Sequence, residues 1–253
     1  PFVLVLDEMN LAHVERYFAD VLSGMESGQR VVPDLELGDD GEYRARSGTN
    51  DLVHLPDNLF IVGTVNVDET TYMFSPKVLD RANTFEFRVL SSDLGGAGSL
   101  LDVEPGSRDL AAGFLEAARL APSASAEDHT FGARLRGLHE LLSKHDREFG
   151  HRTYHEAIRF ARRFREIDSD TTVALDLQVL QKVLPRLHGS RRELTEVLND
   201  LGRWCFHGSD SEASQTFDTA ATEPSGAKLP ASYEKLHRMA KRLRDRHFVS
   251  FAE

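Results

Sequence analysis

An uninterrupted apolar run near the start of the chain constrains the fold more than any other feature. Residues 2–6 read Phe-Val-Leu-Val-Leu, and Asp7 and Glu8 follow at once. Because polar residues do not alternate with apolar ones, the run predicts a strand that is buried on both faces, as in a parallel sheet. Residues 59–64, Leu-Phe-Ile-Val-Gly-Thr, predict a second such strand, and residues 84–89 are a candidate for a third. This part of the chain is therefore expected to be α/β.

Shorter signals lie between these strands. Asn10 is suited to cap a helix, and apolar residues then recur at helical spacing as far as residue 26. The dipeptide Asp40-Gly41, between short alternating stretches, predicts a β-hairpin within residues 30–56.

The composition changes after residue 90. Residues 91–106 are rich in Gly and Ser and predict a linker, and only helices are expected beyond it. The expected organisation is an α/β part at 1–90, the linker, and an all-helical part at 107–253. The periodicity of apolar residues predicts helices at about 107–120, 133–147, 153–167, 173–186, 190–204 and 232–247.

Two sequence signals mark where helices begin. Thr153 with Glu156, and Ser190 with Glu193, match the capping box that opens a helix. Residues 208–230 are polar, small and bear Pro and Gly, so they predict a mobile loop between the last two helices.

Charge and composition restrict the function. The 253 residues carry a formal charge of -11 at pH 7, which argues against a general nucleic-acid coat but not against a local basic patch. The one cysteine, Cys205, excludes an internal disulfide and a multi-cysteine zinc site, and beside Trp204 it is expected in the core. Neither a membrane-spanning run nor a signal peptide is recognised, so a cytoplasmic protein is expected. Because the chain begins at Pro1 inside an apolar run, we expect it to be part of a longer protein.

Polar residues directly after the two predicted strands could carry chemistry. Ligands of open α/β sheets bind at the carboxyl ends of the strands. Asp7 is placed there to hold Mg²⁺, usually through water, and Glu8 to position and deprotonate an attacking water. Asn66 follows the second strand, and Arg81 precedes the third candidate strand. Each feature has an ordinary interpretation, such as a polar loop, a turn or a surface ion pair, but their order and spacing together are more specific.

In this order, the motifs resemble those of McrB-type AAA+ NTPases, the motor subunits of modification-dependent restriction systems. Residues 5–10, Val-Leu-Asp-Glu-Met-Asn, resemble the Walker B motif; residues 63–68, Gly-Thr-Val-Asn-Val-Asp, resemble the sensor 1 loop; and residues 78–81, Val-Leu-Asp-Arg, resemble the arginine finger. Residues 149–154, Phe-Gly-His-Arg-Thr-Tyr, resemble the lid motif near sensor 2. The resemblance covers most of residues 1–205.

The resemblance implies a fold and a set of roles. The fold would be part of an AAA+ P-loop NTPase core with a parallel sheet, followed by an all-α lid. Asp7 would organise Mg²⁺, Glu8 would activate water, and Asn66 would sense the γ-phosphate of ATP or GTP. Arg81 would act on the nucleotide of the neighbouring subunit, and Arg152 would act from the lid. A homo-oligomeric, hexameric ring would drive a partner, a nuclease subunit acting on DNA.

Two departures from the family pattern bear on this interpretation. Glu69 stands where the McrB signature has Arg, so a preference for GTP does not carry over. Arg81 is a single finger candidate in a region where the family is rich in arginine.

The P-loop is absent, because no lysine of the chain is followed by Ser or Thr. The chain alone is therefore expected to be inactive, with exposed strand edges that another segment or chain must cover.

Other interpretations remain open. A MoxR-like AAA+ chaperone would share the core without the DNA role, and a non-catalytic docking module would use only the helical part. Basic residues of the predicted helices at 153–167 and 232–247 could contact DNA, although such faces are usually solvated or paired. His151 and His155, four residues apart, lack the His-Glu-x-x-His pattern of a metal site.

Overall fold

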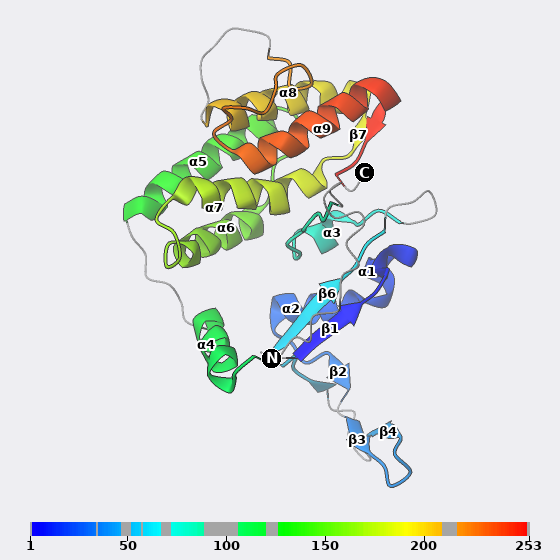
Figure 1. Ribbon diagram of the computed structural model, residues 1–253. Helices are drawn as coiled ribbons and strands as arrows, with labels where there is room; N and C mark the ends of the chain where they lie inside the picture. The colour runs from blue at the N-terminus through cyan, green and yellow to red at the C-terminus, as the bar shows by residue number, and fades with distance from the viewer. Residues whose placement is uncertain are drawn as a thin grey trace, which may run out of the picture. The chain divides into compact units, whose positions relative to one another are not determined.

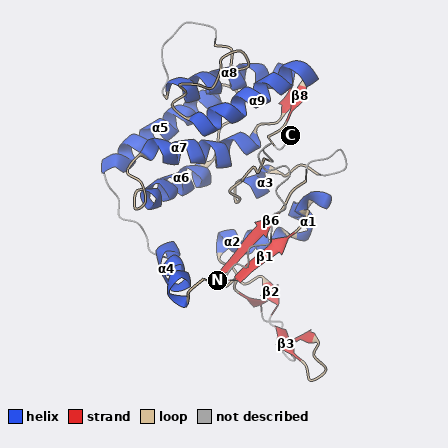
Figure 2. Cartoon of the chain, viewed as in Figure 1, coloured by secondary structure: helices blue, strands red, loops and turns tan. Residues whose placement is uncertain are grey.

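A computed structural model of the chain describes residues 2–33, 35–46, 52–56, 58–66, 72–88, 106–119, 126–208 and 217–251. Its helices and strands make the protein α/β, which confirms the predicted class (Figures 1 and 2). The chain divides into two compact units, Pro1–Arg81 with Ala97–Leu120 (the first unit) and Ala82–Gly96 with Ala121–Glu253 (the second unit). The predicted linker lies almost wholly outside the described residues. Within the described ranges, no helix is both long and apolar enough to cross a membrane.

A parallel pair of strands forms the sheet of the first unit. Strand β1 (Phe2–Leu6) pairs with β6 (Leu59–Gly63) in a register that places Phe2 opposite Leu59 and Leu6 opposite Gly63 (Figure 1). Both apolar runs are therefore strands, as the sequence predicts. The parallel register brings the carboxyl ends of both strands to the same edge of the sheet.

The faces of this pair are open, contrary to the prediction that both strands are buried. Phe2 is 70% exposed, Val5 57% and Val62 48%. Continuous apolar strands become buried when further strands and helices cover both faces of a parallel sheet. In the part of the chain that the structure describes, this sheet has only two strands. The apolar runs therefore predict the two strands correctly, but the described part of the chain contains too few neighbouring elements to bury their side chains.

Short helices and short strands make up the other described elements of the first unit. The predicted helix up to residue 26 is instead the 3-10 turn η1 (Met9–Leu11), α1 (Val14–Tyr17) and α2 (Ala19–Ser27), with a break at Phe18. The predicted hairpin is confirmed, because β3 (Leu35–Leu37) and β4 (Tyr43–Ala45) pair in antiparallel fashion around a turn that contains Gly41. The remaining elements of the first unit are β2 (Val32–Pro33), which pairs with β5 (Leu52–Val53), and the helices α3 (Pro76–Leu79) and α4 (Arg108–Arg119).

The third predicted strand does not form within the described residues. Residues 82–88 belong to the second unit, where the Thr84 amide donates to the carbonyl of Gln181 at 3.2 Å. The Glu86 carboxylate accepts hydrogen bonds from Lys235 and Arg238, each at 2.9 Å. An extended segment becomes a strand only when a neighbouring strand pairs with its backbone, and here side chains of a helix hold the segment instead.

Helices make up most of the second unit in the ranges that the structure describes. Leucines at helical spacing, among them Leu138, Leu175, Leu198 and Leu201, are at most 1% exposed and form one core with Trp204 and Cys205. The elements are α5 (Ala126–Ser143), α6 (His151–Phe164), α7 (Thr171–Gln178), the π turn η3 (Val179–Val183), the 3-10 turn η4 (Leu184–Arg186), α8 (Arg191–His207) and α9 (Pro230–Arg246), with β7 (Gly189–Ser190) paired to β8 (Phe248–Val249).

One of the two predicted capping boxes exists. Ser190 and Glu193 bond reciprocally at the start of α8, as predicted. Thr153 and Glu156 do not cap a helix, because α6 already begins at His151, after Gly150. Both residues lie inside α6, and Gly150 precedes the helix without a side-chain cap.

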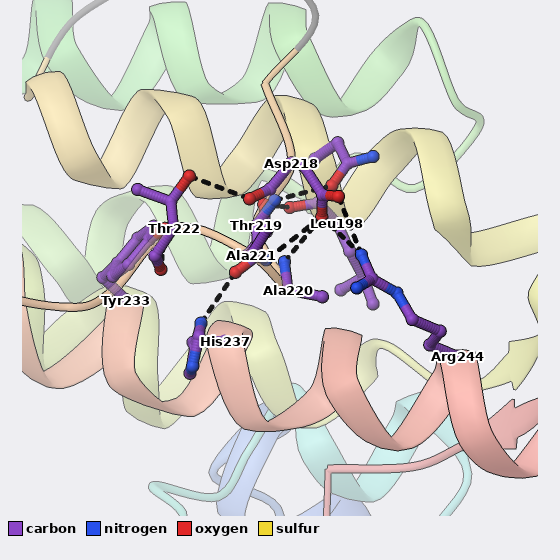
Figure 3. Close-up of polar contacts among 10 residues, drawn as sticks. Leu198, Asp218, Thr219, Ala220, Ala221, Thr222, Tyr233, His237 and Arg244 are labelled. Carbon is purple, nitrogen blue, oxygen red and sulfur yellow. Dashed lines mark hydrogen bonds and ion pairs between the residues drawn. The ribbon is translucent and has the colours of Figure 1, made fainter.

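Polar contacts hold residues 217–222 between α8 and α9 (Figure 3). Thr219 donates through its hydroxyl to the Leu198 carbonyl at 2.9 Å and accepts from His237 at its own carbonyl at 2.8 Å. The Tyr233 hydroxyl donates to the Thr222 carbonyl at 3.0 Å. The described part of the predicted loop is therefore bonded to both helices, while residues 209–216 lie outside the described ranges.

Candidate functional site

Three of the predicted site residues meet where β1 and β6 end. Thr64 directly follows β6, and its hydroxyl donates to the carboxylate of Asp7. The same hydroxyl oxygen accepts from the Glu8 backbone amide at 2.8 Å. The Asn66 side-chain amide donates to Glu8 Oε1 at 2.9 Å. The parallel register, with Leu6 opposite Gly63, explains why the residues that follow the two strands become neighbours.

Glu8 has an unusual backbone conformation. Its φ of 49° and ψ of 44° lie in the left-handed region, which costs a residue with a Cβ roughly 1–2 kcal/mol. The hydrogen bonds from the Glu8 amide to Thr64 and from the Met9 amide to the Thr64 carbonyl, at 2.8 and 3.0 Å, offset this cost. Strained backbone conformations of non-glycine residues cluster at functional sites. The left-handed conformation of Glu8 therefore supports the assignment of a candidate site to the end of β1.

Two members of this cluster were not predicted as site residues. Thr64 could have been recognised, because it follows the second apolar run at the position that corresponds to Asp7 in the first. Asn10 was predicted to cap a helix, but the residue that precedes α1 is His13. Instead, Asn10 is 3% exposed and its side-chain amide donates to the Asn66 carbonyl at 3.0 Å. No sequence pattern distinguishes such a buried asparagine from a helix cap.

Arg81 lies in the first unit, at the end of α3, and is engaged within the chain. Its guanidinium forms an ion pair with Glu26 of α2 and donates to the Lys77 carbonyl at 2.5 Å. The side chain is 16% exposed. A role on a neighbouring subunit would therefore require the pair with Glu26 to open.

Arg152 belongs to the second unit and is part of a different ion-pair group. Its Nε lies 3.3 Å from Glu156 Oε1, one turn further along α6. The other Glu156 oxygen accepts from Lys182 Nζ at 2.5 Å, and the Lys182 side chain is only 2% exposed. A buried lysine of the π turn therefore fixes the carboxylate that faces Arg152.

The residues at the end of β1 suit a hard divalent cation. Asp7 is exposed, and its carboxylate and the Thr64 hydroxyl are oxygen groups of the kind that Mg²⁺ prefers, together with water and phosphate oxygens. Among the described residues, no group of three or more His, Cys, Asp or Glu is arranged to hold a metal ion by itself. A Mg²⁺ ion at Asp7 would therefore need most of its ligands from water and from a bound ligand.

Cys205 and most basic residues of α9 take structural roles, as the sequence led us to expect. Cys205 is fully buried, and burial together with the charge of Asp176 raises the pKa of its thiol well above the ordinary value, which opposes nucleophilic chemistry. The basic residues of α9 are largely paired inside the second unit: Lys235 and Arg238 with Glu86, Lys241 with Glu223, and Arg244 with Asp218. These pairs reduce the charge that α9 could offer to DNA.

Comparison with known proteins places the helical part in a family. Residues 107–248 match a family described as a domain of unknown function, DUF8727. The match covers more than half of the chain, so the chain belongs to this family. No curated protein and no solved structure matches the chain. The matched residues include Arg152, whereas Asp7, Glu8, Asn66 and Arg81 lie outside them.

Proposed function

We propose that the chain is part of a McrB-like AAA+ NTPase that hydrolyses ATP or GTP in a ring and drives a partner, a nuclease that acts on DNA. One observation carries the proposal: Asp7, Glu8 and Asn66 converge at the carboxyl edge of a parallel strand pair, with Asn66 bonded to Glu8 at 2.9 Å. A catalytic carboxylate held by an amide at this edge is suited to orient a water beside a phosphate.

The roles in this proposal follow from the chemistry of each side chain. When bound, Mg²⁺ neutralises charge on the phosphate oxygens, and Asp7 would hold the ion through water. Glu8 would accept the proton of the attacking water, and the Asn66 amide would keep the Glu8 carboxylate in place. Arg81 would act on the nucleotide of a neighbouring subunit after leaving Glu26, and Arg152 would act from a helical lid.

The sequence holds no backbone cradle for the β- and γ-phosphates. A P-loop supplied by residues beyond this chain would complete the site, and further strands supplied with it would cover the exposed faces of β1 and β6. This division of the site predicts that the 253-residue chain alone does not bind ATP or GTP tightly. Isothermal titration of the chain with Mg²⁺ and either nucleotide checks this, and micromolar affinity would contradict it.

Substitution of Glu8 tests the catalytic proposal in the intact protein. Glu8→Gln keeps the size and the contact with Asn66 but removes the base, so we expect nucleotide binding to persist while turnover falls by about 10²- to 10⁴-fold. Glu42→Gln, in the exposed turn between β3 and β4, is the matched control and should leave turnover unchanged. If Glu8→Gln hydrolyses ATP and GTP at the wild-type rate, Glu8 is not the base and the proposal fails.

A further inference from the structure

Asn10 is a buried polar residue beside a sheet whose apolar residues are exposed. Its side chain is 3% exposed, whereas Val3 and Val5 of the preceding strand are 61% and 57% exposed. The amide oxygen Oδ1 is buried without a hydrogen-bond partner among the described residues. Burying an amide with one group unsatisfied costs free energy, so a purely structural role would be served better by an apolar residue.

The contacts of Asn10 reach two described residues that follow β6, Asn66 and Tyr72. Its side-chain Nδ2 donates to the Asn66 carbonyl at 3.0 Å. Its own carbonyl accepts from the Tyr72 amide at 2.9 Å. Asn66 and Tyr72 are the described residues on either side of 67–71, so a single residue bonds to both.

These contacts lead directly to Glu8. Asn66, whose carbonyl is held by Asn10, donates through its side chain to Glu8 Oε1 at 2.9 Å. Asn10 itself is two residues after Glu8, within the turn η1. Asn10, Asn66 and Glu8 therefore form a closed group in which the backbone of Asn66 cannot rotate without losing the bond from Asn10.

We propose that Asn10 is a positioning residue, which holds the backbone of Asn66 so that the Asn66 side chain keeps Glu8 in its reactive orientation. The proposal rests on the function proposed above, since it assigns Asn10 a role in that hydrolysis. Asn10 would touch neither nucleotide nor water, and its effect would act wholly through Asn66. Asparagine suits the position because leucine cannot donate to the carbonyl and aspartate would replace the donor by a negative charge near Glu8.

The first experiment tests the positioning itself in the chain as it stands. The signals of the Asn66 side-chain amide are recorded by NMR and assigned with Asn66→Asp. Asn10→Leu, which is similar in volume but has no donor, should shift or broaden these signals. Asn199→Leu is the matched control, because Asn199 in α8 also bonds a backbone group through its side chain, accepting from Thr219 at 3.0 Å. The control should leave the Asn66 signals in place.

The second experiment measures the consequence for turnover in the intact protein. A catalytic group misplaced by about 1 Å can lose 10²-fold in rate, so we expect Asn10→Leu to lower kcat by about 10- to 100-fold with KM nearly unchanged. Asn199→Leu should retain both values. Asn10→Ser, which is smaller and keeps a hydroxyl donor, should lie between wild type and Asn10→Leu, and it replaces Asn10→Leu if that variant does not fold.

The outcomes separate this proposal from the function on which it rests. Displaced Asn66 signals with a lowered kcat support it. Unmoved Asn66 signals, or displaced signals with an unchanged kcat, overturn it. Full turnover by Glu8→Gln would instead refute Glu8 as the base, whatever the Asn66 signals show.

Discussion

The two units bury their apolar residues to very different extents. In the second unit, Leu175, Leu198 and Leu201 are at most 1% exposed and belong to one continuous core. In the first unit, Leu4 of strand β1 is 40% exposed and Phe2 is 70% exposed. The second unit thus has the packing of a self-contained domain, whereas the strand pair depends on backbone pairing and on polar contacts.

The polar residues of the two units also have different roles. In the second unit they complete the helical framework: the buried carboxylate of Asp176 accepts from the Ala231 and Ser232 amides, both at 2.8 Å, and so caps α9. In the first unit, Asp7, Glu8 and Asn66 gather at a strand end that has little core beneath it. The main apolar core and the cluster of Asp7, Glu8 and Asn66 therefore lie in different units, and each can be altered separately.

Truncating one leucine in each unit should give the largest difference. Leu201→Ala removes a fully buried side chain of α8, so we expect the free energy of unfolding of the second unit to fall by about 2–5 kcal/mol. Leu4→Ala removes a side chain that is already 40% exposed, and should cost below about 1 kcal/mol. Urea unfolding followed by fluorescence of Trp204, the one tryptophan of the chain, reports on the second unit.

The first unit needs its own probe. Amide hydrogen exchange of peptides from β1 and β6 should change little in Leu4→Ala. If Leu4→Ala destabilises its unit as much as Leu201→Ala does, the exposed faces of the strand pair are covered in solution, and the contrast between the units is wrong.

Glycine-to-alanine substitutions should have smaller and opposite effects in the two units. A Cβ on Gly202 of α8 would lie 2.1 Å from the Thr219 hydroxyl oxygen, so Gly202→Ala would push the turn at 217–222 away from the helix. We expect a net loss of about 1–3 kcal/mol, because the clash outweighs the gain in helix propensity. A Cβ on Gly113 of α4 would meet nothing within 4 Å, so Gly113→Ala should stabilise its helix by up to about 1 kcal/mol.

Thermal unfolding of both variants checks these signs. Thr219→Ala combined with Gly202→Ala should restore part of the loss, since Thr219→Ala removes the two atoms that lie nearest to the added Cβ. A stabilised Gly202→Ala would mean that the turn does not lie against α8 as closely as the structure has it.

The positions of helices and strands were predicted better from the sequence than the neighbouring elements that pack against them. Apolar runs identified β1 and β6, and leucine periodicity identified the helices, because both signals are local. The burial of β1 and the strand at residues 84–89 were wrong, since each depends on neighbouring strands that the described residues do not include. Glu86 shows the reason: its side chain is held by Lys235 and Arg238 of α9, about 150 residues away in sequence, and no local pattern encodes that pairing.

The candidate site shows the same limit. Position after a strand identified Asp7, Glu8 and Asn66, because the edge where parallel strands end is set by topology. The pairing of Arg81 with Glu26 and the burial of Asn10 could not be read from the sequence, because both follow from how the short helices pack around the strand ends. The catalytic roles and the nucleotide remain predictions that the proposed substitutions test.

The smallest expected effect concerns the contact between residues 82–88 and α9. Burial raises the pKa of Glu86, but the hydrogen bonds from Arg238 and Lys235 outweigh this, so the pKa lies below its ordinary value of 4.5. The unfolded chain then binds the proton more readily than the folded one. The stabilisation is fully present above pH 4.5 and is lost as the pH falls through the lower, folded pKa. Burial also lowers the pKa of Lys235 from its ordinary value of 10.5, and the hydrogen bond to Glu86 acts in the opposite direction.

Glu86→Gln isolates this contribution. Comparing its melting temperature with that of wild type from pH 7 to pH 3 cancels other carboxylates, such as Glu193, whose pKa is lowered by hydrogen bonds from Ser190 in both proteins. We expect wild type to be more stable at pH 7, with the difference shrinking steadily below pH 4.5. A difference that is constant with pH would show that Glu86 does not titrate against α9. The segment after Arg81 would then be held by the Thr84 backbone bond and by the ion pair of Arg88 with Glu234, rather than by the charge of Glu86.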